Sequence, residues 1–120
     1  MPDIAAIVED LAAFQNIGGC ALVETDTGMV WHFAGHLPHI ERVAEAAIEF
    51  WRIQHRLSSH LETLGSLRSV ACSFSDQVIA LFPCCEKPNL VLVCIAAKGD
   101  IAWSEWSDKA SELRKALAAV

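Results

Sequence analysis

The sequence predicts an α/β (α+β) domain with the element order α-β-β-α-β-β-β-α. Apolar residues repeat at helical spacing in three segments, five short apolar runs have the length of strands, and turns containing glycine or aspartate separate them. The chain has 120 residues, the size of one domain. A chain of this length buries roughly two thirds of its unfolded surface, which supports a core without metals or disulfides.

The N-terminal third predicts a helix followed by a β-hairpin. The helix is predicted to end at Gly18-Gly19, and its apolar residues at helical spacing are Ile4, Ile7, Val8, Leu11 and Phe14. Residues 20–24 and 29–34 are strand-like, and the Asp-Thr-Gly turn between them leaves Gly28 free to take a positive φ. The two strand-like runs therefore form a hairpin.

From Pro38 onward no helix breaker occurs until Gly65, which predicts one long helix. Its apolar residues cover an arc roughly 200° wide, well beyond the ~100° that one core needs. The longer edge of this arc is predicted to face the sheet and comprises Phe50, Ile53, Leu57, Leu61 and Leu64. The shorter edge is predicted to face a partner protein and comprises Ile40, Ala44, Ile48 and Trp51.

Three strands and a last helix complete the prediction. Residues 90–97 are apolar on both faces, which is typical of a central strand covered twice. Residues 67–74 are rich in serine and resemble an edge strand, residues 77–82 form the strand between, and residues 83–89 are predicted to be a loop. The last helix carries a narrow apolar stripe of Trp103, Trp106, Ala110, Leu113, Leu117 and Val120.

Charge and hydropathy exclude several classes of partner. The net charge is −6 and the nine basic residues are scattered, which argues against nucleic acid and against an anionic membrane surface. The longest apolar run, residues 90–97, is too short to insert across a membrane as a helix. The N-terminus has no basic region of the kind that opens a signal peptide, so a cytoplasmic location is expected. With 53% hydrophobic residues, the apolar surplus indicates a protein interface.

The five cysteines are expected to be reduced, because their number is odd and no export signal precedes them. Cys20, Cys72 and Cys94 lie in strand-like runs and are predicted to be small buried hydrophobes. Cys84 and Cys85 lie in the predicted loop, so a thiol enzyme that uses one of them is an alternative.

No motif predicts catalysis or a cofactor. The phosphate-binding GxxxxGK[ST] pattern, GxGxxG and HExxH are all missing from the sequence. His36 and His39 could offer two imidazoles to a metal, but no cysteine or carboxylate pair follows at a matching spacing, so a solvated junction is preferred. No nucleophile and base are brought together by any pattern, and the chain is therefore predicted to have no catalytic, cofactor-binding or metal site.

Three sequence segments carry a resemblance that covers nearly the whole chain. They are GGCALVETDTGMV in the first hairpin, RVAEAAIEF in the long helix and VIALFPCCEKPNLVLVCIA in the last hairpin. In these three segments and in the order of its elements, the chain resembles the roadblock/dynein-light-chain family. The resemblance implies a single roadblock-like domain over residues 1–120. The resemblance implies a profilin-like fold, in which the long helix covers one face of a five-stranded antiparallel sheet and the terminal helices cover the other.

The resemblance also implies a homodimer that pairs through the third strand and the second helix into a ten-stranded sheet. The residues expected in this interface are Ile40, Ala44, Ala47, Ile48, Trp51, His55, Arg68, Ser69, Val70, Ala71 and Cys72. Members of the family typically act as scaffolds or regulators of small Ras-like GTPases or as subunits of motor complexes. The expected function is a non-enzymatic homodimeric scaffold that binds a small GTPase, and the alternative to it is a ligand-sensing profilin-like module with a pocket between sheet and helix.

Overall fold

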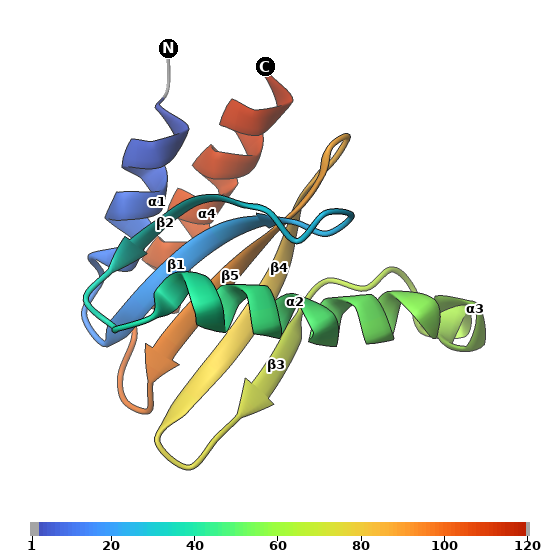
Figure 1. Cartoon of the computed structure of the whole chain (residues 1–120), viewed down its shortest axis with the longest axis horizontal. Coiled ribbons are helices and arrows are strands. Elements are labelled where there is room, and N and C mark those ends of the chain that lie inside the picture. The colour runs from blue at the N-terminus through green and yellow to red at the C-terminus, as the bar shows by residue number, and fades with distance from the viewer. Residues whose placement is uncertain (1–2, 120) are drawn as a thin grey trace.

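The computed structural model describes residues 3–119, which form a five-stranded antiparallel sheet with helices on both faces (Figure 1). In chain order the elements are α1 (Ile4–Ala12), β1 (Ile17–Glu24), β2 (Val30–Gly35), α2 (Ile40–Arg56), α3 (Ser58–Leu61), the 3₁₀ turn η1 (Glu62–Leu64), β3 (Val70–Ser73), β4 (Gln77–Glu86), β5 (Asn89–Ala97) and α4 (Trp103–Ala118). The strand order across the sheet is β2-β1-β5-β4-β3. The predicted fold class is confirmed, with α3 as an added short helix.

Strands β1 and β5, the two central strands named below, are buried on both faces. Along β1, Ala21 and Val23 face the layer under α2, whereas Cys20 and Leu22 face the layer under α1 and α4. Figure 1 shows α2 alone on one side of the sheet and α1 with α4 on the other. This arrangement explains why the sequences of β1 and β5 have no polar side chain between their ends, where Glu24 closes β1 and Asn89 opens β5.

Helices α1 and α4 are joined to each other as well as to the sheet. The indole Nε1 of Trp106 donates a hydrogen bond of 3.2 Å to the carbonyl oxygen of Leu11, and the Trp106 side chain is almost wholly buried. At the surface the Lys109 ammonium lies 3.2 Å from a carboxylate oxygen of Asp10 and 2.9 Å from one of Glu112. The short helix α1 therefore depends on α4 for its position.

The predicted orientation of the long helix is wrong. Ile40, Ala44, Ala47, Ile48 and Trp51, which were predicted to face a partner, pack against the sheet and are at most 6% exposed. The opposite edge is exposed instead: Phe50, Ile53, Leu57, Leu61 and Leu64 range from 36% to 80% exposure. Ala44 and Ala47 on this buried side are small enough to allow a close approach to the sheet. The longer edge includes Leu61 of α3 and Leu64 of η1, and Figure 1 shows that α2 and α3 extend past β3.

Glycine backbone gives the N-terminus of α2 room to pack. A Cβ added to Gly19 would lie 1.9 Å from Cδ1 of Ile40, so only glycine permits this contact. Gly18 and Gly19 are part of β1 and do not end the first helix, which stops at Ala12. The long helix also stops early, at Arg56, and the following residues form α3 and η1.

The last hairpin is longer than predicted. Strand β4 continues through the segment predicted to be a loop, as far as Glu86, with a register shift between Pro83 and Cys85. Strand β3 is shorter, because only residues 70–73 pair with β4. In α4 the predicted stripe is buried at Trp106, but Trp103 is 41% exposed. Val120 lies outside the described residues.

The cysteine positions follow from these strand boundaries. Cys20 and Cys94 are buried as predicted, but Cys72 is only half-buried because β3 is an edge strand. Cys84, predicted to lie in a loop, is buried in β4, and burial raises the pKa of its thiol to about 11 against an opposing effect of Arg114. Cys85 is half-buried.

We expect Trp51→Ala to lower the free energy of unfolding by about 3–5 kcal/mol, because it removes a large side chain from the layer between α2 and the sheet. Urea denaturation followed by circular dichroism measures this loss. Trp103→Ala is the matched control, because Trp103 is 41% exposed and makes an edge-to-face contact with Trp106, worth about 0.5–1.5 kcal/mol. Equal losses for the two variants would contradict the burial of Trp51.

In the folded chain as a monomer, Cys72 and Cys85 should react with N-ethylmaleimide before the other three cysteines, because they are the two that are not buried. Timed quenching followed by peptide mass spectrometry gives the order of modification. In urea the five rates should converge. Modification of Cys84 ahead of Cys72 would show that β4 does not extend past Phe82.

Candidate interaction surface

Strand β3 ends the sheet with unpaired backbone groups. The amide nitrogen of Phe74 donates to the carbonyl oxygen of Gln77 at 2.8 Å, which fixes the alternation of the antiparallel ladder between β3 and β4. By that alternation, the N–H and C=O groups of Ala71 and Ser73 point away from β4, toward the open edge. Residues 70–73 contain no lysine or proline of the kind that protects an edge from pairing.

An exposed apolar surface lies on the outer side of α2 and continues through α3 and η1. On α2, Ala46, Phe50, Ile53 and Leu57 follow one another at spacings of four, three and four residues, the pattern of a helix that packs along another helix. The outer apolar surface, as named below, comprises Ala46, Phe50, Ile53, Leu57, Leu61, Leu64 and Leu67. Exposed apolar groups in one patch typically mark a site of protein interaction.

The outer apolar surface adjoins the β3 edge. A hollow of about 330 Å³ lies between α3–η1 and the segment leading into β3, and it is lined by Leu61, Leu64, Leu67, Arg68 and Ser69 among others. The backbone edge and the apolar side chains therefore form one region of the molecule.

The predicted interface residues fall into two groups. Those on α2 from Ile40 to Trp51 lie in the core and are not available at the surface. His55 is exposed, and the five residues from Arg68 to Cys72 lie at the β3 edge with exposed or half-buried side chains. The sequence reasoning assigned Phe50, Ile53 and Leu57 to the core, because their spacing of three and four residues is shared by the edge that is in fact buried.

Strand β2 forms the opposite edge of the sheet and also carries exposed apolar side chains. Met29, Trp31 and Phe33 are 57%, 38% and 53% exposed. The ladder between β1 and β2 is interrupted here, since Leu22 pairs with His32 but Val23 pairs with Val30, which leaves Trp31 without an opposite residue. The indole Nε1 of Trp31 donates to Oε1 of Glu24 at 3.2 Å.

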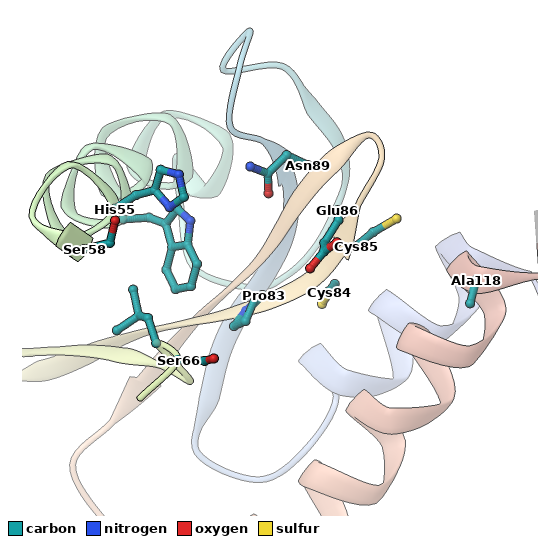
Figure 2. A pocket seen from close by; sticks show the side chains of 11 residues that line it. His55, Ser58, Ser66, Pro83, Cys84, Cys85, Glu86, Asn89 and Ala118 are labelled. Atoms are coloured by element: carbon teal, nitrogen blue, oxygen red, sulfur yellow. The ribbon is translucent and has the colours of Figure 1, made fainter. Parts of the chain in front are cut away.

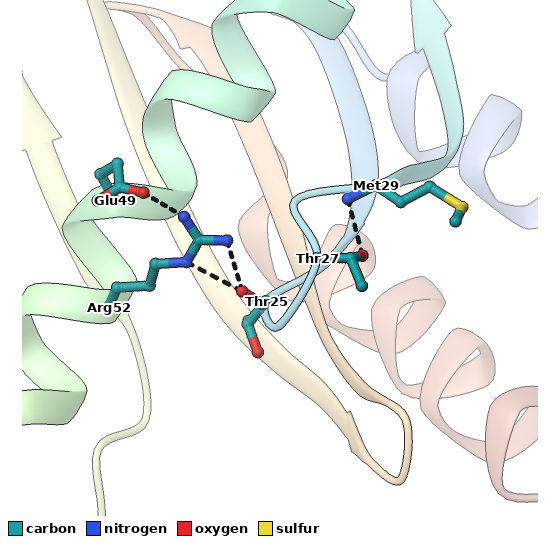
Figure 3. A network of polar contacts seen from close by, with 5 residues as sticks. All are labelled: Thr25, Thr27, Met29, Glu49 and Arg52. Atoms are coloured by element: carbon teal, nitrogen blue, oxygen red, sulfur yellow. Dashed lines mark hydrogen bonds and ion pairs between the residues drawn. The ribbon is translucent and has the colours of Figure 1, made fainter.

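A polar network holds the turn between β1 and β2 against α2 (Figure 3). The Arg52 guanidinium donates two hydrogen bonds to the carbonyl oxygen of Thr25, from Nε at 2.9 Å and from Nη2 at 2.6 Å. Its third nitrogen pairs with the Glu49 carboxylate. Within the turn, Oγ1 of Thr27 accepts from the amide of Met29 at 3.1 Å. The network fixes α2 against the end of β1. It therefore also fixes the orientation of the outer apolar surface of α2 relative to the sheet.

A cleft of about 860 Å³ surrounds the end of strand β4 (Figure 2). On the α2 side it is lined by Trp51, His55 and Leu67, and Pro83 of β4 separates this part from the part beside Ala118 of α4. The lining is mostly apolar, and its two thiols, Cys84 and Cys85, donate to backbone carbonyl oxygens at 3.8 Å and 3.6 Å and not to a side chain. The raised pKa of Cys84 keeps that thiol protonated near neutral pH, which is unfavourable for a nucleophile.

The structure places the remaining polar candidates apart. Within residues 3–119, no three histidine, cysteine or carboxylate side chains gather in a geometry that would hold a metal ion. His39 precedes α2 with a left-handed backbone (φ 61°) and His36 is exposed at the end of β2. No helix among the described residues has the length and apolar content needed to cross a bilayer.

Comparison with known proteins gives matches only among solved structures. No protein-family model and no curated protein matches the sequence. The roadblock/LC7 domain from Streptomyces avermitilis superposes with a TM-score of 0.79 at 14% identity, covering 98% of this chain and 97% of that one. MglB from Myxococcus xanthus superposes with a TM-score of 0.76 at 15% identity, covering 98% and 96%.

A third match, the gliding protein MglB from Thermus thermophilus, has a TM-score of 0.70 at 12% identity and covers 97% of this chain and 86% of that one. Another solved structure of MglB is described as having a tetrameric arrangement. At these identities the likeness shows the fold alone. That fold is the roadblock/LC7 fold.

Proposed function

We propose that the chain is a homodimeric, non-enzymatic scaffold or regulator that binds a small Ras-like GTPase. The observation that carries the proposal is the open β3 edge beside the outer apolar surface of α2. Antiparallel pairing of two β3 edges about a two-fold axis would satisfy the free backbone groups of Ala71 and Ser73 and join two sheets into one of ten strands. The same operation would bring the two α2 helices together.

The proposed interface differs from the sequence prediction on the helix and agrees with it on the strand. The helical part is the outer apolar surface, with Phe50, Ile53 and Leu57 at its centre. The strand part keeps the residues from Arg68 to Cys72, and His55 lies at the rim. An interface of this composition is apolar at the centre and polar at the rim, as expected for a stable dimer.

We expect Phe50→Glu to convert the dimer into a folded monomer. Phe50 is 36% exposed in the isolated chain, so the charge costs little there, but two-fold symmetry places two such charges in one desolvated interface. Size-exclusion chromatography with light scattering at micromolar concentration gives the mass. Glu45→Lys, an exposed position on the polar side of α2, is the control that should remain dimeric. A wild-type chain that is monomeric at this concentration would contradict the proposed interface.

The strand part of the same interface can be tested through Cys72. Residues 70 and 72 of β3 share the face that bears α2, and antiparallel self-pairing brings each copy near its counterpart. A short bis-maleimide should therefore link two chains in the Cys85→Ser variant and fail to do so in Cys72→Ser. A protein that is dimeric by light scattering but not linked through Cys72 would have a different interface.

The GTPase partner is the part of the proposal that rests on the family resemblance. Since no catalytic constellation is found among residues 3–119, the mechanism would be preferential binding of one nucleotide state. The resulting shift in the population of the two states is limited by the difference in affinity for them. We expect a small Ras-like GTPase of the same genome to bind at least about tenfold more tightly in one nucleotide state, or ~1.4 kcal/mol.

Calorimetry with each GTPase loaded with GDP or a non-hydrolysable GTP analogue measures this difference. Phe50→Glu, as a folded monomer, should lose affinity if the dimer presents a composite surface, while Glu45→Lys should retain it. Equal affinity for both states in every pair would reject regulation by state selection. Such a result would leave the dimer itself untouched.

The cleft around β4 supports a second candidate, a ligand-sensing module. Its volume is within the range of small-molecule sites and Trp51 lines it. A small molecule released on denaturing the purified protein, and absent from a Leu67→Trp variant that fills the cleft, would favour this function.

A further inference from the structure

Cys20 and Cys94 lie directly opposite each other in the two central strands. They are paired in the ladder between β1 and β5. In the same ladder the amide of Thr25 donates to the carbonyl oxygen of Asn89 at 2.9 Å, which identifies the hydrogen-bonded pairs and, by alternation, makes Cys20–Cys94 a non-hydrogen-bonded pair. In such pairs the Cα atoms are about 4.5 Å apart, inside the range of about 4.4–6.8 Å that a disulfide spans.

Both thiols are completely covered. Each residue is 0% exposed and belongs to the layer that contains Val8 and Leu11 of α1 and Trp106 of α4. The hydrogen bond with Cys94, followed by burial, raises the pKa of Cys20 well above its usual value. In the closed fold, Cys20 is therefore protonated, and burial shields both side chains from reagents, since the thiolate is the reactive form.

Helix α1 is the shorter of the two helices in this cover, with nine residues against sixteen in α4. It has nine residues, fewer than the roughly 12–15 that an isolated helix needs to be stable. Its N-terminus is capped by the Asp3 carboxylate, which accepts from the amides of Ala5 at 3.0 Å and Ala6 at 3.4 Å. It is held in place by the Trp106–Leu11 hydrogen bond, by the Lys109–Asp10 ion pair and by the buried side chains of Ile7, Val8, Leu11 and Ala12, which pack in the layer shared with α4. Opening of such a unit leaves the sheet intact.

We propose that Cys20 and Cys94 form a redox-sensitive pair that a hydroperoxide closes to a cross-strand disulfide when α1 opens. One thiol, deprotonated in the open state, attacks a peroxide oxygen; with hydrogen peroxide this gives a sulfenic acid and one molecule of water. The second thiol then attacks the sulfenic sulfur, the S–S bond forms, and a second water leaves. In sum, two thiols lose two hydrogens and one hydrogen peroxide becomes two waters.

The expected disulfide is reversible. A Cα separation of about 4.5 Å lies at the short end of the disulfide range, and strained disulfides are reduced more readily than relaxed ones. The closed α1 protects the thiols, so any partner that holds α1 down should slow the oxidation. The pair would thereby report both the presence of peroxide and the state of the helix.

The test uses the folded wild-type chain, whose accessible thiols are first blocked by a brief treatment with N-ethylmaleimide. Hydrogen peroxide is then added and peptides are mapped without reduction. We expect a peptide pair joined through Cys20 and Cys94, lighter by two hydrogens and restored by dithiothreitol. Cys20→Ala, checked for folding by circular dichroism, should give no linked peptide. A pair that stays reduced in the folded wild-type chain while it links in urea would overturn the proposal.

The role of α1 is tested by Asp3→Ala, which removes the cap and should speed the linkage about fivefold. The matched control is Asp108→Ala on the exposed side of α4, which should leave the rate unchanged. Equal rates in Asp3→Ala and the wild-type chain would show that oxidation does not pass through opening of α1.

Discussion

The burial of β1 and β5 on both faces is the constraint on which the rest of the structure depends. A sheet with two apolar faces needs two covering layers, and the chain provides α2 for one and the pair α1 and α4 for the other. The helices are connected accordingly: α4 holds α1 through the buried indole of Trp106, and Arg52 holds α2 to the turn that ends β1. Because the sheet is covered on both faces, its edges are the only places where it can pair with another chain.

The exposed apolar surface arises from the length of α2 and its extension. The helix and α3 reach past β3, so the residues there have no sheet beneath them. Leu57 follows the end of α2 and is exposed, whereas Phe50 is exposed because it lies on the side of α2 opposite Ile48 and Trp51, which pack against the sheet. A monomer with this surface would expose both a pairing edge and an apolar helix, and the proposed dimer would cover both.

The fold was largely predictable from the sequence, but the orientation of α2 was not. Strand alternation and turn residues predicted the hairpins, because these signals are local. Both apolar edges of α2 satisfy the helical period equally well, and only the contact of Ile40 with Gly19 across the layer decides which edge faces the sheet. Cys84 was misplaced for a related reason: Pro83 suggested a loop, whereas the register shift beside it lets β4 continue. In the candidate site the β3 edge was predictable and the helical surface beside it was not.

The register shift in β2 also affects how far the assembly can grow. If two chains join at β3, each end of the shared sheet is a β2 strand. Pairing of these β2 strands with the β2 strands of further dimers would begin a filament. At Trp31 the ladder loses its regular pairing, and a bulge of this kind bends and twists an edge away from a flat partner strand. The two ends of one molecule thus differ in competence for growth: β3 is regular, and β2 is distorted. Assembly through β3 would stop at a closed pair instead of propagating as a fibre.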